Sequence, residues 1–476
     1  MKTRLKSPLY LQLAENVEGM ITAGTLRAGD RVPSVRQLSR QHKVSVPTVV
    51  QAYTLLESRR VIEARPKSGF YVRPKQAVGL TEPAMPRRVP AAADLKGFAP
   101  LMSVIHDIAD PALVPLGGAI PSAELLPLDK LSRITSGILR KTTAAAINYD
   151  PTPGCLGLRK ELGRRSLDWG CYLEADHFIL TNGASEALHL ALRAVTRPGD
   201  TVIVESPVYY GLLHILSELH LKALAVPASA RDGISIEGVE LAVKRGKVAA
   251  IVVIPNFSNP LGSFMPEENR KALLDLAAAR GIPVIEDDIY GDIPHEGPRP
   301  RCLKSLDTHD NVILCGSFSK TLAPGFRSGF IASERHRDRL IALKMSINFA
   351  NTSLQALALA EFLRTGGYDH HLRRLRHTYR GQVGKMREAI AATFPSSTKV
   401  SNPAGGFVLW LELPTHVDSR EIFQTAREAG ISVAPGFLFS PASEFNHCLR
   451  ISCGFPWSPR IETAVAQLGQ IVARRV

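Results

Sequence analysis

One lysine stands in a stretch whose residue types could do covalent chemistry. Residues 315–330 read Cys-Gly-Ser-Phe-Ser-Lys-Thr-Leu-Ala-Pro-Gly-Phe-Arg-Ser-Gly-Phe, which places Lys320 between Ser317 and Arg327. The apolar run 312–315 before it is typical of a buried strand. A lysine that emerges from such a strand loses hydration, so its charged form is disfavoured and its amine becomes nucleophilic. A serine and an arginine beside it would suit a phosphate group.

A nucleophilic amine next to a phosphate site fits a pyridoxal-phosphate (PLP) Schiff base, in which lysine bonds the aldehyde of the cofactor. The same sixteen residues are equally compatible with a surface loop that carries an ordinary lysine. The elements around Lys320 must decide between these two interpretations.

Short apolar runs alternate with helical patterns on both sides of Lys320. We expect strands at 178–180, 201–204, 249–254, 283–285 and 312–315, with helices at 185–195, 211–219 and 266–280 between them. This alternation predicts an α/β fold with a mostly parallel sheet. Ligands of such sheets bind beyond the carboxyl ends of the strands.

Polar and small residues follow four of these predicted strands. The turn 181–185 would let backbone N–H groups at a helix start approach a phosphate. Tyr209 could stack on a flat ring, and Asn259 offers an amide donor. The acidic run 286–288 could keep a pyridine nitrogen protonated. Each feature alone also fits a plain turn or a helix cap, but their order, ending at Lys320, favours a cofactor site.

This ordered set resembles the fold-type I PLP-dependent enzymes of the aminotransferase family over residues 113–476. The resemblance implies Lys320 as the Schiff-base lysine, Asp287 on the pyridine nitrogen, Tyr290 and Asn259 on the ring hydroxyl, and Tyr209 stacked on the ring. It implies that the phosphate is held by Ala184, Ser185, Ser317 and Arg327, and by Tyr149 of a neighbouring subunit. It also implies a homodimer, with Arg450 and the loop around Gly118 binding the carboxylate of an amino compound.

Positive charge is concentrated at the start of the chain. Residues 1–75 hold fourteen Lys or Arg and five Asp or Glu, which is +9 of the +14 net charge. Such asymmetry indicates a small nucleic-acid-binding unit joined to a nearly neutral larger one. A basic, solvated terminus with no partner remains an alternative on charge alone.

The pattern of the basic region predicts a winged helix-turn-helix. Apolar residues at helical spacing indicate a helix over 9–21, and Ser34 and Ser45 are suited to cap two further helices around a turn at 41–43. Residues 61–73 then predict two short strands around a basic tip. A helical oligomerisation cap is the alternative.

The runs 30–39, 44–49, 52–57 and 68–72 resemble the winged helix-turn-helix of GntR-type transcription regulators. The resemblance implies that Arg36, Ser45 and Thr48 touch DNA. The sequence departs from the family at Val46, where arginine is common. We expect the same DNA-facing surface to include Ser34, Gln51, Arg65 and Lys67.

A linker is expected between the two parts, over 76–112. Residues 74–100 contain five prolines and no sustained periodicity, which is typical of a semi-extended tether. The predicted domains are therefore a DNA-binding domain at 1–75, the linker, and a PLP-binding domain at 113–476.

Composition excludes several other classes of protein. The six cysteines form no Cys-x-x-Cys pair and no cluster with histidine, so neither a disulfide framework nor a metal site is expected. There is no apolar run long enough to span a membrane and no secretory signal at the start, so the cytoplasm is the expected compartment.

The two resemblances together identify the arrangement of the MocR subfamily of GntR-type regulators. This implies a transcription regulator that binds operator DNA and PLP and senses an amino compound. Two alternatives stay open: a catalytic aminotransferase acting on an amino acid, with a vestigial basic head, and a sensor of PLP alone.

Overall fold

The computed structural model divides the chain into two compact units. The first unit contains residues up to 79, and the second contains almost all of the remainder. The structure describes residues 8–22, 25–26, 29–58, 61–65, 68–73, 80–86, 89, 91–93, 102, 104–107, 110–442 and 444–476.

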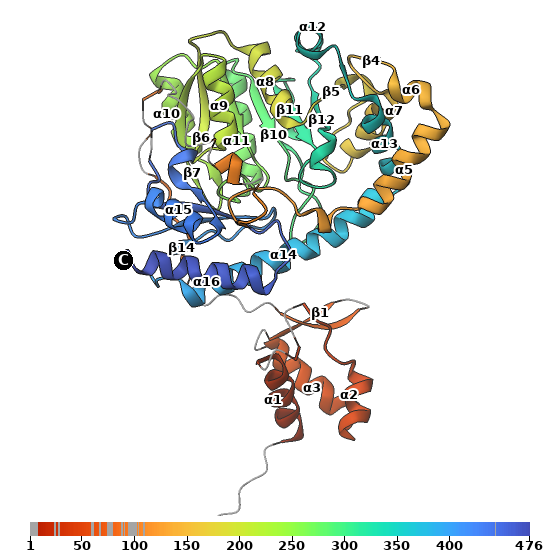
Figure 1. Cartoon of the computed structure of the whole chain (residues 1–476), viewed down its shortest axis with the longest axis vertical. Helices are drawn as coiled ribbons and strands as arrows, with labels where there is room; N and C mark the ends of the chain where they lie inside the picture. Colours follow the sequence, from red (N-terminus) through yellow and green to blue (C-terminus); the bar gives the residue numbers. More distant parts are fainter. Residues whose placement is uncertain are drawn as a thin grey trace, which may run out of the picture. The chain divides into compact units, whose positions relative to one another are not determined.

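The first unit consists of three helices followed by an antiparallel two-stranded ribbon (Figure 1). The elements are α1 (Leu9–Thr22), α2 (Val35–His42), α3 (Val46–Ser58), β1 (Ile62–Arg65) and β2 (Gly69–Val72). Apolar residues at helical spacing on the helices, and one from each strand, share a core that includes Leu13, Leu38, Val49, Leu56, Ile62 and Val72. The predicted winged helix-turn-helix is confirmed.

Serine side chains cap the two helices of the helix-turn-helix. Ser34 Oγ accepts a hydrogen bond from Gln37 N at 3.2 Å, and Ser45 Oγ accepts one from Thr48 N at 3.3 Å. The turn between the helices is shorter than predicted, because α2 continues to His42. Lys43 then ends the helix in a left-handed conformation with φ 54°, which reverses the chain within one residue.

An eight-stranded sheet organises the second unit (Figure 1). Its strand order is β5-β12-β11-β10-β9-β6-β7-β8. The strands are β5 (Phe178–Thr181), β6 (Thr201–Ser206), β7 (Lys222–Ser229), β8 (Gly233–Ile234), β9 (Ala250–Val253), β10 (Val284–Asp287), β11 (Val312–Ser317) and β12 (Gly329–Ala332). Neighbours from β11 to β7 pair in parallel, whereas β12 and β8 pair antiparallel. The predicted α/β fold with a mostly parallel sheet is confirmed.

Helices cover both faces of this sheet. Of these helices, α8 (Ala184–Val195) and α9 (Tyr210–Glu218) pack on one face, and α10 (Ile236–Arg245) and α11 (Glu267–Ala279) pack on the other. Further helices of the second unit are α5 (Leu128–Lys141), α6 (Thr143–Ile147), α7 (Leu156–Ser166), α12 (Arg337–Asn348), α13 (Ser353–Arg364), α14 (Gly367–Thr393), α15 (Ser419–Glu428) and α16 (Pro459–Ala473). Short 3-10 helices are η1 (Ala123–Leu125), η2 (Ala175–His177), η3 (Leu303–Leu306), η4 (Pro324–Phe326) and η5 (Gly436–Phe439).

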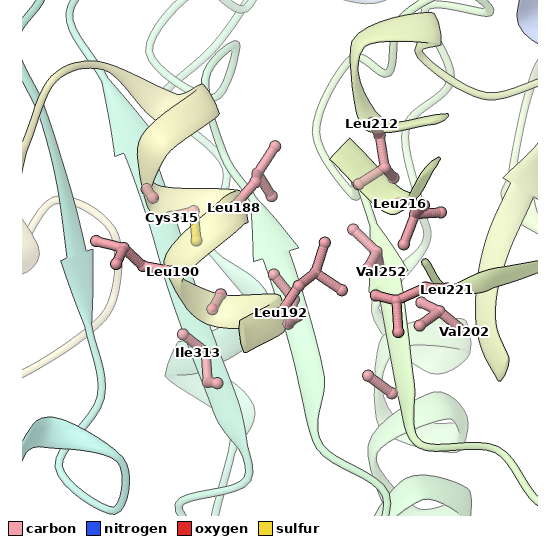
Figure 2. Packing of buried hydrophobic residues seen from close by; sticks show 14 of the residues in the cluster. Leu188, Leu190, Leu192, Val202, Leu212, Leu216, Leu221, Val252, Ile313 and Cys315 are labelled. Carbon is pink, nitrogen blue, oxygen red and sulfur yellow. The ribbon is translucent and has the colours of Figure 1, made fainter. Parts of the chain in front are cut away.

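Successive residues of the central strands point into two separate cores. On β6, Val202 and Val204 pack with α8 and α9, whereas Ile203 packs with α10 and α11. Figure 2 shows the first of these cores, where leucines of α8 lie over Ile313 of β11. Because both faces are buried, the strands read as continuous apolar runs, and this is why the sequence located them.

A smaller, four-stranded sheet has the order β14-β15-β18-β17. Its strands are β14 (Lys399–Val400), β15 (Val408–Glu412), β18 (Cys448–Ser452) and β17 (Ala434–Pro435). Two further pairs are β4 (Asp150–Pro151) with β13 (Ala350–Asn351) and β3 (Val114–Pro115) with β16 (Ile431–Ser432).

The predicted linker is bound to the second unit where the structure describes it. We call its residues 80–86, 89 and 91–93 the strap. Val400 N donates to Thr81 O at 2.9 Å, and Ala84 N donates to a carboxylate oxygen of Glu412 at 3.2 Å. Ala93 forms an antiparallel bridge with Ala223 of β7. These residues are not a free tether, because their backbone bonds to both sheets.

Within the described ranges, no helix combines the length and the apolar character needed to cross a membrane. No group of three or more His, Cys, Asp or Glu side chains in these ranges could hold a metal ion. All six cysteines are buried and free.

Candidate functional site

Polar side chains meet beyond the carboxyl ends of the parallel strands. Asp287 is the last residue of β10, Tyr209 follows β6, and Lys320 follows β11 by three residues. Electrostatic interactions connect these three with side chains from other segments. We call the set the Lys320 cluster; its members are Lys320, Asp287, Tyr209, Tyr290, Arg327 and Arg450. The structure therefore brings together six residues that the sequence placed in one site.

Several buried polar atoms at this edge make no hydrogen bond to any described residue. They are Asp287 Oδ1, Asn259 Oδ1, Tyr290 Oη, and Nε and Nη1 of Arg450. Leaving a buried polar atom without a partner costs about 1–3 kcal/mol, and more for a charged group. Five such atoms, drawn from one acid, one amide, one phenol and one guanidinium, indicate a site that a polar ligand completes.

Burial makes Lys320 a nucleophile. Loss of hydration, and next the positive charge of Arg450, lower the pKa of Lys320 to about 8, although Asp287 opposes the shift. Lys320 Nζ donates to Ala119 O at 2.6 Å, which aims the amine at the loop after β3. The uncharged amine, which carries the free lone pair that attack on a carbonyl requires, is therefore far more populated near neutral pH than in an exposed lysine.

Two carboxyl groups lie near the cluster in an apolar setting. Burial, and next the negative charge of Asp288, raise the pKa of Asp287 to about 7, although Lys320 opposes the shift. Burial also raises the pKa of Glu205, at the end of β6, to about 8. Both groups can therefore hold a proton near neutral pH, and each can donate to or pair with a nitrogen base.

An anion subsite is built where α8 begins. Gly183 precedes the helix with φ 82°, and a Cβ at this position would collide with the guanidinium of Arg327. Arg327 Nη1 donates to Ser319 Oγ at 3.2 Å, and Ser319 Oγ lies 2.9 Å from Ser317 Oγ. The free N–H groups of a helix N-terminus, two hydroxyls and an arginine are the donors that bind a phosphate. Ala184 and Ser185 form the first turn of this helix.

Within the Lys320 cluster, Arg450 has guanidinium nitrogens that bond no described residue. It is fully buried in β18, directly opposite Trp410 of β15. Its Nη2 donates to Gly117 O, next to Gly118, while Nε and Nη1 are left without a partner among the described residues. A buried guanidinium that keeps unused donors suits a carboxylate. The complete burial of Arg450 excludes a surface salt bridge.

A second layer of contacts fixes the residue after Lys320. Thr321 Oγ1 lies 2.7 Å from Tyr368 Oη, and Tyr368 Oη lies 2.8 Å from a carboxylate oxygen of Asp292. His371 Nε2 lies 2.6 Å from Thr321 O. Because Tyr368 and His371 belong to the first turns of α14, this helix holds the backbone that carries the reactive amine.

Tyr149 lies apart from these residues within one chain. Its side chain is 82% exposed, and its ring meets the edge of Phe349 at 5.6 Å.

The helix-turn-helix places its predicted contact residues on the surface of the first unit. Ser34, Arg36, Ser45 and Gln51 are exposed, and Thr48 is half-buried. Arg65 bonds Glu63 at 2.9 Å and stacks over the ring of Tyr71 at 4.2 Å. Lys67 lies outside the described residues.

Sequence reasoning missed two residues of the site. Ser319 connects Ser317 to Arg327. The sequence feature that could have indicated it is a second serine hydroxyl within residues 315–330. Glu205 was given no role from the sequence. The feature that could have indicated one is that it is the single charged residue of β6.

We predict a pH-dependent gain in stability for Asp287→Asn in protein freed of small molecules. Because the carboxyl is protonated in the folded chain and ionised in the unfolded chain between about pH 4 and pH 7, its contribution falls as pH rises. The free energy of unfolding of the variant, relative to that of the parent chain, should therefore rise by on the order of 4 kcal/mol between about pH 4 and pH 8. Calorimetric unfolding at both pH values measures this, with the fully exposed Asp338→Asn as control. An equal difference at both pH values would contradict it.

Comparison with known proteins identifies the family. Residues 141–465 match the aminotransferase class I and II family, and residues 9–72 match the gntR family of bacterial regulatory proteins. The HTH-type transcriptional regulators YjiR and YdcR of Escherichia coli strain K12 are 37% and 36% identical, and each alignment covers 98% of this chain and 99% of the relative.

Solved structures resemble the second unit. A kynurenine aminotransferase from Pyrococcus horikoshii, in complex with PMP, is 26% identical with a TM-score of 0.75, over 80% of this chain and 96% of that one. LysN, an α-aminoadipate aminotransferase from Thermus thermophilus, is 26% identical with a TM-score of 0.74 over the same shares. The chain therefore belongs to the aminotransferase class I and II family and carries an N-terminal GntR-type helix-turn-helix, the domain arrangement of the MocR regulators.

Proposed function

We propose that this protein is a DNA-binding transcription regulator that binds PLP through Lys320 and senses an amino compound. The observation that carries the proposal is the end-to-end similarity to HTH-type transcriptional regulators, over 98% of the chain and both of its units. The proposed domains are 1–75 for DNA, 76–112 as the connection, and 113–476 for PLP, and the proposed compartment is the cytoplasm.

The Lys320 cluster fits PLP in charge and in donor set. Lys320 would bond the aldehyde carbon, Asp287 would pair with the ring nitrogen, and Tyr290 and Asn259 would bond the ring hydroxyl. Each of the last three residues has a buried atom that lacks a partner among the residues described. When bound, PLP supplies an aldehyde that reacts with amines and a ring that withdraws electrons from them.

The remaining contacts would hold the ring and the phosphate. Tyr209 would stack on the ring, since it lies among the charges of the cluster and next to Tyr210. The phosphate would take its donors from the start of α8 and from the arginine–serine pair: Ala184, Ser185, Ser317, Ser319 and Arg327.

Arg450 is the proposed carboxylate anchor of the sensed compound, with Gly118 lining the same place. Its two free donors are buried, so an unpaired carboxylate would gain a charge-assisted, bidentate contact there. An α-amino acid would meet Arg450 with its carboxylate and Lys320 with its amine, because both side chains reach carbonyls of the 117–119 loop.

We infer that the protein works as a homodimer. Several large apolar side chains of the second unit are exposed in the single chain, among them Ile147 at 73%, Tyr149 at 82% and Phe349 at 45%. Clusters of this kind are typical of protein interfaces. A two-fold arrangement would also allow Tyr149 to reach the phosphate of the neighbouring subunit.

Two other functions remain alternatives, and a particular observation favours the first. A catalytic aminotransferase acting on an amino acid is favoured by the lowered pKa of Lys320, which would let this amine move a proton. Sensing of PLP alone, with no amino compound, would need the cofactor residues but not Arg450.

Lys320→Ala should abolish covalent attachment of PLP. We expect the visible absorbance of the bound cofactor to disappear, and borohydride treatment to add the cofactor mass to the Lys320 peptide of the parent chain only. Lys271→Ala, which changes an exposed lysine of α11, is the matched control and should behave like the parent. Labelling of another lysine in the parent chain would sink the assignment.

Specific DNA binding should require the basic face of the helix-turn-helix. Genomic fragments captured by the full chain should shift in a salt-dependent manner, and Arg36→Ala should weaken binding to all sequences and reduce the salt slope by about one. In parallel, turnover of amino acids with keto acids tests the enzymatic alternative. Fast multiple turnover without sequence-specific DNA binding would refute regulation.

Arg450→Lys should weaken the response to amino acids while leaving PLP bound. A lysine keeps the positive charge but loses the fork, so we expect about a tenfold or greater rise in the concentration needed to alter DNA affinity. Titration of DNA binding against amino acids, and against PLP alone, measures this. An unchanged response in the variant, with PLP still effective, would favour the sensor of PLP alone.

A further inference from the structure

The outward face of α3 is apolar and uncharged near its start. Its inner face is completely buried through Val49, Ala52, Tyr53 and Leu56. On the other side, Val46 and Val50 are 45% and 46% exposed and lie one helical turn apart, so they form a small apolar patch on one face.

No arginine or lysine stands anywhere on α3. The helix reads Val-Pro-Thr-Val-Val-Gln-Ala-Tyr-Thr-Leu-Leu-Glu-Ser, so its one charged residue is Glu57. Glu57 lies near the far end of the helix, where its carboxylate accepts a hydrogen bond from Ala64 N at 3.1 Å. The first two turns of α3 therefore carry no charged side chain.

The exposed side chains at the start of α3 are few. The hydroxyls of Ser45 and Thr48 lie 2.7 Å apart and serve the cap. Of the residues that follow Ser45 within two turns, the exposed ones are Val46, Pro47, Val50 and Gln51. Beyond the capping hydroxyls, the surface at this end of the helix is thus made of two valines, a proline ring and one amide.

Positive charge lies on the preceding helix instead. Arg36 and Arg40 of α2 are exposed and one turn apart, and Lys43 follows them at the turn. In a helix-turn-helix the first helix crosses the phosphate backbone and the start of the second helix reaches the base edges. In this geometry α2 supplies the positive charge that binds phosphates, and α3 supplies the side chains that contact base edges.

We propose that α3 reads A·T base pairs, with Val46 and Val50 packed on thymine methyl groups and Gln51 bonded to adenine. Guanine in the major groove is read chiefly by arginine or lysine, which α3 lacks, whereas apolar side chains match the thymine methyl and glutamine matches adenine N6 and N7. The inference deepens the proposed function and rests on it.

The test begins with selection of duplexes from a random library by the full chain. We expect half-sites with A·T pairs at the core positions. Replacing thymine by deoxyuridine at those positions removes only the methyl groups. Each replacement should weaken binding about fourfold, which corresponds to roughly 0.8 kcal/mol for one buried methyl-sized group.

Variants connect the effect to the two valines. Val46→Ala and Val50→Ala should each weaken binding to the selected duplex and lose the sensitivity to deoxyuridine at one position. Met20→Ala, which shortens an exposed apolar side chain of α1, is the matched control and should keep the full sensitivity. Unchanged binding to random DNA at low salt checks that each variant retains a folded first unit. Gln51→Ala should relax the preference for adenine at its own position.

The outcomes separate the inference from the proposed function. Selected half-sites of G·C pairs, or full affinity for deoxyuridine duplexes, would overturn the reading of thymine while leaving a DNA-binding regulator in place. Failure to enrich any sequence would overturn both.

Discussion

The Lys320 amine and the Asp287 carboxyl group are both buried away from water at one edge of the sheet. The rest of the structure depends on this constraint. Opposite charges at Lys320 and Asp287 attract, yet burial outweighs the attraction: the pKa of Lys320 falls to about 8 and that of Asp287 rises to about 7. Loss of hydration thus shifts both groups toward the neutral form. A cationic ring nitrogen beside Asp287 would return that carboxyl to its charged state, so the unpaired polar atoms around it favour binding.

Such a site needs a rigid frame, and buried ion pairs beneath it supply one. Arg299 contacts Asp288 and Asp292, and its Nε lies 2.6 Å from an Asp292 oxygen. Asp292 in turn meets Tyr368, which lies against Thr321. Removing one partner from a buried pair leaves an uncompensated charge, so these positions resist change far more than surface ion pairs do. These contacts fix Thr321, the residue after Lys320, and they do not involve the Lys320 amine itself.

The sequence was informative where periodicity decides the fold. Strands buried on both faces, such as β6 and β11, appear as apolar runs, and the residues that end them must share one edge; Asp287 and Lys320 were located in this way. Contacts that depend on three-dimensional packing were not accessible. The bond from Arg450 to Gly117 joins residues 333 apart in the chain, and the bridge through Ser319 depends on how the Arg327 side chain turns. Proline content predicted an extended linker but carried no information on what its backbone bonds.

The strap bonds to both of the sheets that contribute to the proposed site. The strap is tied to β14 and β15 through Thr81 and Ala84, and to β7 through Ala93. Arg450 lies on β18, which pairs with β15 in the same small sheet, whereas Asp287 ends β10 of the large sheet and Lys320 lies in the segment that follows β11 of that sheet. Under the proposed function, a compound that contacted both Arg450 and Lys320 would bridge the same two sheets that the strap bonds.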